Sequence, residues 1–144
     1  MMRKTCINLR GDIIQELLPS TFTFHDQHPL AFESYNKYKD DENLHVVTLV
    51  DNGAAIGYCA YFFAASVDIT TYISVVVESV FIQKSYRDKH LSNLLAKYAS
   101  FDLKKFSKSI TQDISQCRFI NHSDTISNEG KRFSERVIKL ASVI

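Results

Sequence analysis

The sequence contains few of the residues that link or separate domains: it has four glycines and two prolines in 144 residues. It shows no internal repeat and no low-complexity tract, so there is little room for a flexible linker. We therefore expect a single domain spanning residues 1–144. A chain of this length buries roughly two-thirds of the surface that its unfolded form exposes.

Membrane and export signals are also missing from the sequence. No apolar run approaches the ~20 residues that a membrane-spanning helix needs. The first four residues, Met-Met-Arg-Lys, lead into polar sequence rather than into the apolar core of a signal peptide. Cys6, Cys59 and Cys117 are odd in number, widely spaced and without the paired spacing of a metal site. These absences predict a chain that works in a reducing, cytosol-type compartment and contacts no membrane.

Charge is nearly balanced overall, with a net charge of +1, but it is unevenly distributed. Between Lys84 and Lys108 the cations outnumber the acids, whereas between Asp26 and Asp51 the acids predominate. Opposite charge on two segments fits one surface that holds a small polyanion and another that prefers a cation. Two ordinary solvated surfaces would give the same pattern, so both interpretations stay open.

Apolar periodicity and turn signals predict an α+β chain. Asn52-Gly53 is a strong hairpin signal because both residue types tolerate positive φ. The β-branched, nearly all-apolar run up to Ile82 predicts a strand in the middle of a sheet. An antiparallel meander followed by a strand–helix–strand unit gives a mixed sheet. We expect strands at 5–9, 45–50, 54–64, 70–82 and 117–120, helices at 12–18, 88–106 and 129–140, and helix with loop at 25–38.

Residues 75–95 are the most informative segment. An apolar strand, interrupted only by the carboxylate of Glu78, leads into a short cationic turn and then into an amphipathic helix. The start of a helix presents free N–H groups and the positive end of the helix dipole, which together favour an anion. Lys84, Arg87 and Lys89 add positive charge there. Glu78 is either a residue on the solvent side of the sheet or a catalytic one.

This order of elements resembles the GNAT superfamily of N-acetyltransferases, and the specific part of the resemblance lies within 75–95. The family has an Arg/Gln-x-x-Gly-x-Gly/Ala turn whose backbone amides hold the pyrophosphate of acetyl-CoA. The matching segment here is Arg87-Asp88-Lys89-His90-Leu91-Ser92. His90 stands at the first glycine, and Ser92 stands at the second small residue. The histidine could donate a hydrogen bond to a phosphate or could occupy the space that the ligand needs.

The resemblance implies a GNAT-like fold, with a central mixed, mostly antiparallel, twisted sheet flanked by helices, and acetyl-CoA as co-substrate. It also implies roles for individual residues. Glu78 would help to remove a proton from the attacking amine, and Asn128 would contact the cofactor. The backbone of Val80, Phe81 and Ile82 would pair with the pantetheine arm of acetyl-CoA. Phe133 stands where the family has a tyrosine acid, so water, Tyr98 or Ser134 would have to protonate the thiolate.

The sequence thus predicts a cytoplasmic N-acetyltransferase that acetylates a primary amine of a small molecule or peptide by direct attack. The acidic segment suggests a cationic acceptor such as a polyamine. The competing hypothesis is a catalytically inactive GNAT-like module with a structural or interaction role, for example in a phage particle (virion). A homo-oligomer or a larger assembly would fit either hypothesis. No nucleic-acid partner is expected, and no metal, because His25 and His28 lack a third ligand nearby.

Overall fold

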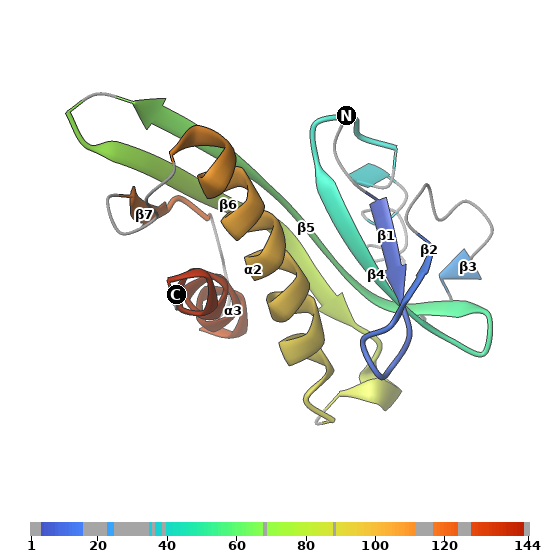
Figure 1. Ribbon diagram of the computed structural model, residues 1–144. Coiled ribbons are helices and arrows are strands. Elements are labelled where there is room, and N and C mark those ends of the chain that lie inside the picture. The colour runs from blue at the N-terminus through green and yellow to red at the C-terminus, as the bar shows by residue number, and fades with distance from the viewer. Residues whose placement is uncertain are drawn as a thin grey trace. The chain divides into compact units, whose positions relative to one another are not determined.

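The structure is a computed structural model that describes residues 4–15, 23–24, 35, 37–38, 40–67, 69–87, 89–111, 117–123 and 128–142 (Figure 1). It divides into two compact units. The first unit comprises residues 1–60 and 79–95, and the second comprises residues 61–78 and 96–144. Strand β5 (Ala54–Val67), strand β6 (Thr71–Ile82) and helix α2 (Leu91–Ile110) each contribute residues to both units. The predicted single domain stays a prediction.

The first unit is built on strands arranged in the order β2-β1-β4-β5-β6, with β3 beside β5. Strand β1 (Lys4–Ile7) runs parallel to β4 (His45–Asp51) and antiparallel to β2 (Ile13–Gln15). Figure 1 shows β1 lying between these two neighbours. Strand β3 (Thr23–Phe24) pairs in parallel with the start of β5. Of the segment 25–38, the structure describes Tyr35, Lys37 and Tyr38, which are helical.

The helix predicted at 12–18 is wrong over its first part, because Ile13–Gln15 form strand β2. The reason is a tight turn organised by Asn8, whose side-chain oxygen accepts the N–H groups of Arg10 and Asp12, both at 2.9 Å. Gly11 adopts the positive φ of 88° that such a turn needs. The chain therefore reverses at Asp12, which caps no helix, and pairs with β1. Residues 16–20 lie outside the described part.

The hairpin between β4 and β5 turns at Asn52 and Gly53, which have φ values of 52° and 76°. The predicted turn is confirmed, because both residues adopt the left-handed conformation of a two-residue hairpin. Nothing lies within 4 Å of the position where a Cβ on Gly53 would stand. Glycine is thus needed there for its backbone conformation and not for space.

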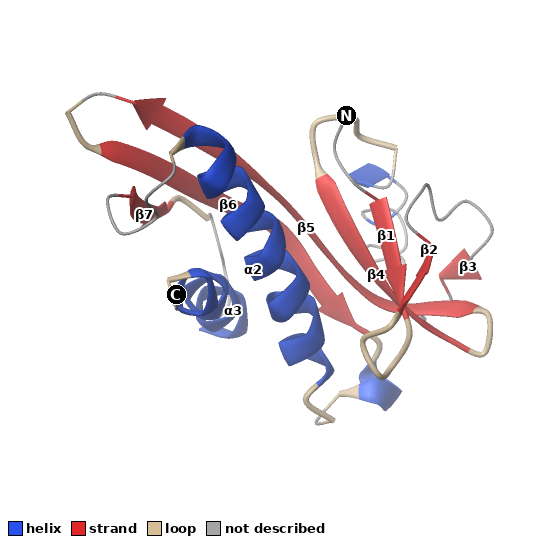
Figure 2. Ribbon diagram, in the orientation of Figure 1, coloured by secondary structure: helices blue, strands red, loops and turns tan. Residues whose placement is uncertain are grey.

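The second unit contains the strands β5-β6-β7, where β7 (Cys117–Asn121) runs parallel to β6. Figure 2 shows the hairpin of β5 and β6 as the longest pair of strands. Helix α2 packs on this hairpin, because the Tyr61 hydroxyl donates to Asp102 and the Phe63 and Phe106 ring centroids are 5.7 Å apart. Helix α3 (Asn128–Ala141) contacts β7 through side chains.

The α+β class, the mixed sheet and the flanking helices are confirmed. The strands at 45–50, 54–64, 70–82 and 117–120 and the last helix occur within a few residues of their predicted bounds. Helix α2 begins three residues later than the predicted 88 and ends at Ile110, and a short 3-10 helix, η1 (Lys84–Tyr86), precedes it. Within the described residues, no helix is long and apolar enough to cross a membrane.

Candidate functional site

The second half of β6 differs in its packing from the first half. Ile73, Val75 and Val77 are buried and alternate with less buried neighbours, as in a strand that has one covered face. From residue 79 to residue 82 the alternation is lost, and all four side chains are half-buried. Val80, Phe81 and Ile82, for which the sequence predicts ligand contact, lie in this stretch. It combines apolar side chains with incomplete burial.

Gly57 on β5 allows the end of β6 to approach closely. A Cβ added at Gly57 would stand 3.0 Å from the carbonyl oxygen of Phe81 and 3.3 Å from a side-chain carbon of Ile82. A contact of 3.0 Å is tighter than nine in ten real Cβ contacts, so a larger residue at 57 would require the Phe81–Ile82 backbone to shift by a few tenths of an ångström. Sequence analysis missed this residue, because a glycine inside a strand signals a close approach without saying to what.

Arg87 folds back onto the end of β6. Its Nε donates to the carbonyl oxygen of Ile82 at 2.8 Å, and its guanidinium carbon lies 5.3 Å from the centroid of the Phe81 ring. The hydrogen bond and the cation–π contact use one donor and one face of the guanidinium, which leaves its remaining N–H donors available to an anion. The structure thus brings together three of the predicted site residues, Phe81, Ile82 and Arg87.

Helix η1 is tied to the β4–β5 hairpin by Tyr86. Its hydroxyl donates to Asp51 Oδ2 at 2.7 Å, and this hydrogen bond raises the pKa of Tyr86. The ammonium of Lys89 lies 5.4 Å from the centroid of the Tyr86 ring. A hollow of about 410 Å³ lies beside Asp51, between the turns at 8–10 and 50–53. Tyr86 therefore attaches the turn after β6 to the β4–β5 hairpin. This role was not predicted from the sequence.

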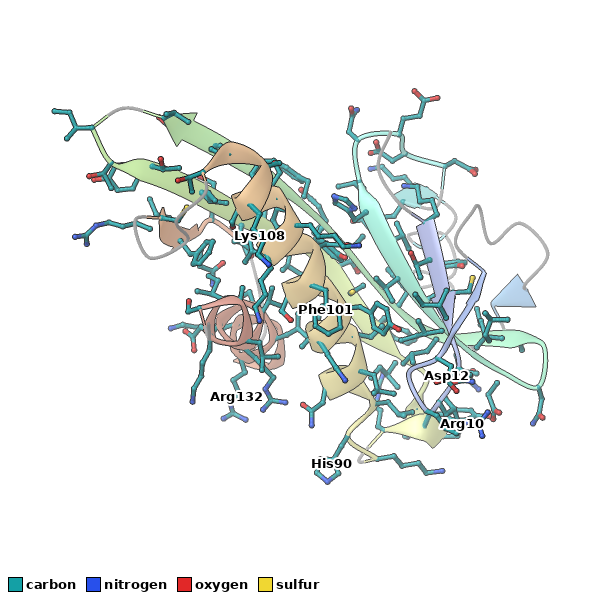
Figure 3. The ribbon with its side chains drawn as sticks, in the orientation of Figure 1. Arg10, Asp12, His90, Phe101, Lys108 and Arg132 are labelled. Atoms are coloured by element: carbon teal, nitrogen blue, oxygen red, sulfur yellow. The ribbon has the colours of Figure 1, made fainter. Side chains whose placement is uncertain are left out.

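His90 occupies a left-handed backbone conformation, with φ at 58°. Among non-glycine residues of the described chain, only Asn52 shares a positive φ. The His90 side chain is exposed, and Figure 3 shows it pointing away from the first turn of α2. His90 thus has a backbone conformation that glycine adopts far more readily than other residues do.

At the start of α2, two backbone donors have no partner among the residues that the structure describes. The Asn93 N–H bonds to the His90 carbonyl oxygen at 3.1 Å, which closes the first turn. The N–H groups of Leu91 and Ser92 precede the first intrahelical bonds and meet no partner in the part of the chain that the structure describes. Arg87, His90, Leu91 and Ser92 therefore lie in one turn, and the N–H groups of Leu91 and Ser92 have no acceptor among the described residues. Asp88 lies outside the described residues.

A buried acceptor without a donor lies just before this turn. The Gln83 side-chain oxygen Oε1 is buried and has no hydrogen-bond partner among the described residues. The backbone of Gln83 is fixed, because its N–H donates to the Ile56 carbonyl oxygen at 2.7 Å. A buried acceptor that lacks a donor costs about 1–3 kcal/mol.

The other predicted site residues belong to the second unit. Glu78 is exposed on β6, and Asn128 is the first residue of α3, with a side chain outside the described part. Phe133 is buried, with 6% of its surface exposed. Ser134 is fully buried, accepts a hydrogen bond from the Asn121 side chain at 2.8 Å and lies 3.0 Å from the Lys131 carbonyl oxygen. These bonds occupy the Ser134 hydroxyl, so it is a poor proton donor.

The end of β7 is held against β6 by one serine. Backbone pairing of the two strands ends with Val75 opposite Asn121, followed by the His122 N–H bonded to the Val75 carbonyl oxygen. One step further, the Ser123 hydroxyl accepts the Val77 N–H at 2.9 Å. Ser123 thus replaces the last backbone bond between the strands. The sequence carried no signal for this contact.

Comparison with known proteins gives structural matches only. No family model matches the sequence, and no curated protein matches it. The crystal structure of the KacTA–DNA complex is similar, with 16% identity, coverage of 81% of this chain and 77% of that chain, and a TM-score of 0.56. Ribosomal-protein-alanine N-acetyltransferase from Brucella melitensis biovar Abortus 2308 gives 12% identity, coverages of 77% and 73%, and a TM-score of 0.47.

The aminoglycoside N-acetyltransferase AAC(6')-Iy, in complex with CoA, gives 15% identity, coverages of 75% and 76%, and a TM-score of 0.45. The match to the KacTA–DNA structure indicates a shared fold, whereas the TM-scores of the other two are too low to carry weight. The matching solved structures include several acetyltransferases.

Proposed function

We propose that this chain is a GNAT-type N-acetyltransferase that transfers the acetyl group of acetyl-CoA to a primary amine. The observation that carries the proposal is the backbone of His90. The residue that stands at the motif's glycine has a left-handed conformation, with φ at 58°, and its side chain is exposed. A left-handed residue at this position supports a turn that would hold a pyrophosphate even though the glycine is not there.

The turn has the chemistry that a diphosphate requires. The N–H groups of Leu91 and Ser92 would donate to phosphate oxygens, and the positive end of the α2 dipole adds to the attraction. Arg87 would contribute the donors that its bond to Ile82 leaves available. Asp88 and Lys89 complete the segment that matches the motif.

The half-buried stretch that ends β6 suits the pantetheine arm of acetyl-CoA. The backbone of Val80, Phe81 and Ile82 would pair with the amides of the arm, and the lone acceptor of Gln83 supports an N–H partner in this region. Glu78 would accept a proton as the amine attacks, and Asn128 would contact the cofactor. When bound, acetyl-CoA would supply the activated acetyl thioester.

A cationic acceptor is part of the proposal. Asp40 and Glu42 are exposed and Asp41 is half-buried, on a loop that immediately precedes β4. The ammonium of Lys4 holds this loop by donating to the carbonyl oxygens of Asp41 and Leu44. A fixed group of carboxylates favours an amine that carries additional positive charge, such as a polyamine.

A catalytically inactive GNAT-like module with a structural role is the competing proposal. Two observations favour it: Phe133 has no proton to give, and the Ser134 hydroxyl is already bonded. Such a module could keep the fold of an acetyltransferase while its surface served a larger assembly.

Acetyl-CoA is expected to raise the melting temperature of the protein. A ligand at about 100 times its dissociation constant adds about 2.7 kcal/mol of stability, which corresponds to roughly 5–11 °C in a domain of this size. Thermal unfolding with and without acetyl-CoA measures the shift. Arg87→Ala should reduce it, whereas the matched control Lys105→Ala, an exposed cation on α2, should keep it. A melting temperature that saturating acetyl-CoA leaves unchanged would rule out the transferase.

A further inference from the structure

Helix α2 carries lysines and a phenylalanine on the face opposite its buried one. Side chains three and four positions apart in a helix lie on the same face, one turn above the other. Within the second unit, the buried face of α2 is formed by Ala99, Leu103 and Ser107. The opposite face carries four residues that we call the α2 stripe: Lys97, Phe101, Lys104 and Lys108. Figure 3 shows Phe101 and Lys108 on the side of α2 that faces away from the sheet.

The α2 stripe is positively charged and has no acid beside it on the helix. Lys97 and Lys108 are exposed, and Lys104 is half-buried. None of the three forms an ion pair with a residue that the structure describes. The only acid of α2, Asp102, is half-buried and accepts a hydrogen bond from the hydroxyl of Tyr61 on β5. Three ammonium groups are therefore spread along ~17 Å of helix, given a rise of ~1.5 Å per residue.

An aromatic ring lies among these charges. Phe101 exposes 43% of its surface, although α2 has a buried face on which apolar side chains pack. The ammonium of Lys97 lies 5.8 Å from the centroid of the Phe101 ring, and the ring of Tyr98 lies 6.0 Å away in an edge-to-face arrangement. The α2 stripe thus combines positive charge with an exposed aromatic surface.

We propose that the α2 stripe binds single-stranded nucleic acid, with its lysines on phosphates and a base stacked on Phe101. The lysines complement the charge of the phosphodiester chain, and every base has a face that can stack on an aromatic ring. From the sequence we expected no nucleic-acid partner, because the sequence alone does not show that Phe101 is exposed among the lysines. The inference is independent of the proposed acetyl transfer.

Two other polyanions fit the α2 stripe less well. A duplex keeps its bases stacked on one another, so it could contact the lysines but could not stack a base on Phe101. An anionic membrane binds a helix that inserts an apolar face. The apolar face of α2 is buried within the protein, and Phe101 is the only apolar side chain of the stripe.

Fluorescence anisotropy of labelled oligo(U) and oligo(dT) of equal length, titrated with the protein at several salt concentrations, tests the proposal. Three phosphate contacts to a single strand give a slope of about −2 in log affinity against log salt, so affinity should fall roughly 20-fold between about 50 and about 200 mM salt. Binding of either strand supports the proposal, and the tighter one identifies the preferred sugar. A wild-type chain that binds neither strand at about 50 mM salt would overturn it.

Replacing the three lysines of the α2 stripe together by glutamine should remove this salt dependence and weaken binding by roughly 10-fold or more. The matched control removes the same charge from three exposed cations of α3: Lys131→Gln, Arg132→Gln and Lys139→Gln. It should bind as the wild type does. Equal losses in the two triple variants would show attraction by net charge alone and would contradict a site on α2.

Phe101 separates single-strand binding from general attraction to polyanions. Phe101→Ala should weaken binding roughly 10-fold, because the stacked base loses its platform, whereas Phe101→Tyr keeps an aromatic ring and should bind as the wild type does. Both changes are at a partly exposed position, and melting temperatures check that the variants fold. Equal affinity of the two variants, tighter binding of a duplex than of either strand, or binding to phosphatidylserine vesicles without binding to the oligonucleotides would each overturn the proposal.

Discussion

Replacing Lys4 with methionine is expected to lower the free energy of unfolding by about 3 kcal/mol. Lys4 is buried, with 6% of its surface exposed. Its ammonium donates to the carbonyl oxygens of Tyr38, Asp41 and Leu44, at 3.2, 2.5 and 2.6 Å. Burial lowers the pKa of this amine, because its charged form has lost water, and the three carbonyl oxygens replace that water. Methionine fills the space but removes this donor from the buried Leu44 carbonyl oxygen, whereas the carbonyl oxygens of Tyr38 and Asp41 keep the N–H groups of Asp41 and Leu44.

Urea unfolding of Lys4→Met measures the loss. The matched control is Lys37→Met, because Lys37 is an exposed lysine of the same unit and its replacement should change stability by less than about 0.5 kcal/mol. Equal midpoints for wild type and Lys4→Met would show that the loop before β4 does not depend on this ammonium. The proposal that Lys4 holds the loop of Asp40, Asp41 and Glu42 in place would then be wrong.

Glu78→Gln is expected to reduce turnover of acetyl-CoA by about 100-fold, the lower end of what a general base contributes. Glutamine keeps the size and polarity of the side chain but cannot accept the proton of the attacking amine. The affinity for acetyl-CoA should change little, because the proposed phosphate contacts are made by residues 87–92.

Steady-state kinetics with a polyamine acceptor separate these effects into kcat and KM. Glu135→Gln is the matched control, because Glu135 is an exposed carboxylate on α3 of the same unit. Full activity in Glu78→Gln would remove Glu78 from the mechanism and leave water as the proton acceptor. A wild-type chain that binds acetyl-CoA but shows no activity would favour the catalytically inactive GNAT-like module.

Much of the fold could be predicted because local signals and long-range packing agree. Asn52-Gly53 adopts positive φ at both residues, and the apolar run up to Ile82 became a strand flanked by β5 and β7. The strand–turn–helix order around residues 82–91 was also correct. Within the site, the motif position that the resemblance gives to His90 stays a prediction, although its φ of 58° is one that glycine adopts readily.

The features that the sequence did not predict correctly, or did not predict at all, depend on a single turn or on contacts between residues distant in sequence. Ile13 and Ile14 fit a helix or a strand equally well, since a short apolar run does not fix the period. The side chain of Asn8 decided the outcome by turning the chain back on β1. The burial of Lys4, the close approach at Gly57 and the Ser123 contact each require a partner at least 20 positions away, which no local pattern specifies.

Titration of the isotope-labelled chain with acetyl-CoA, followed by the amide resonances of residues 90–92, is the most direct test of the proposed site. We expect the Leu91 and Ser92 resonances to shift and saturate. His90→Gly should bind at least as tightly, because glycine keeps the left-handed backbone and removes a Cβ beside the proposed phosphate site. Resonances of residues 90–92 that stay in place at millimolar acetyl-CoA, in both wild type and His90→Gly, would contradict the site.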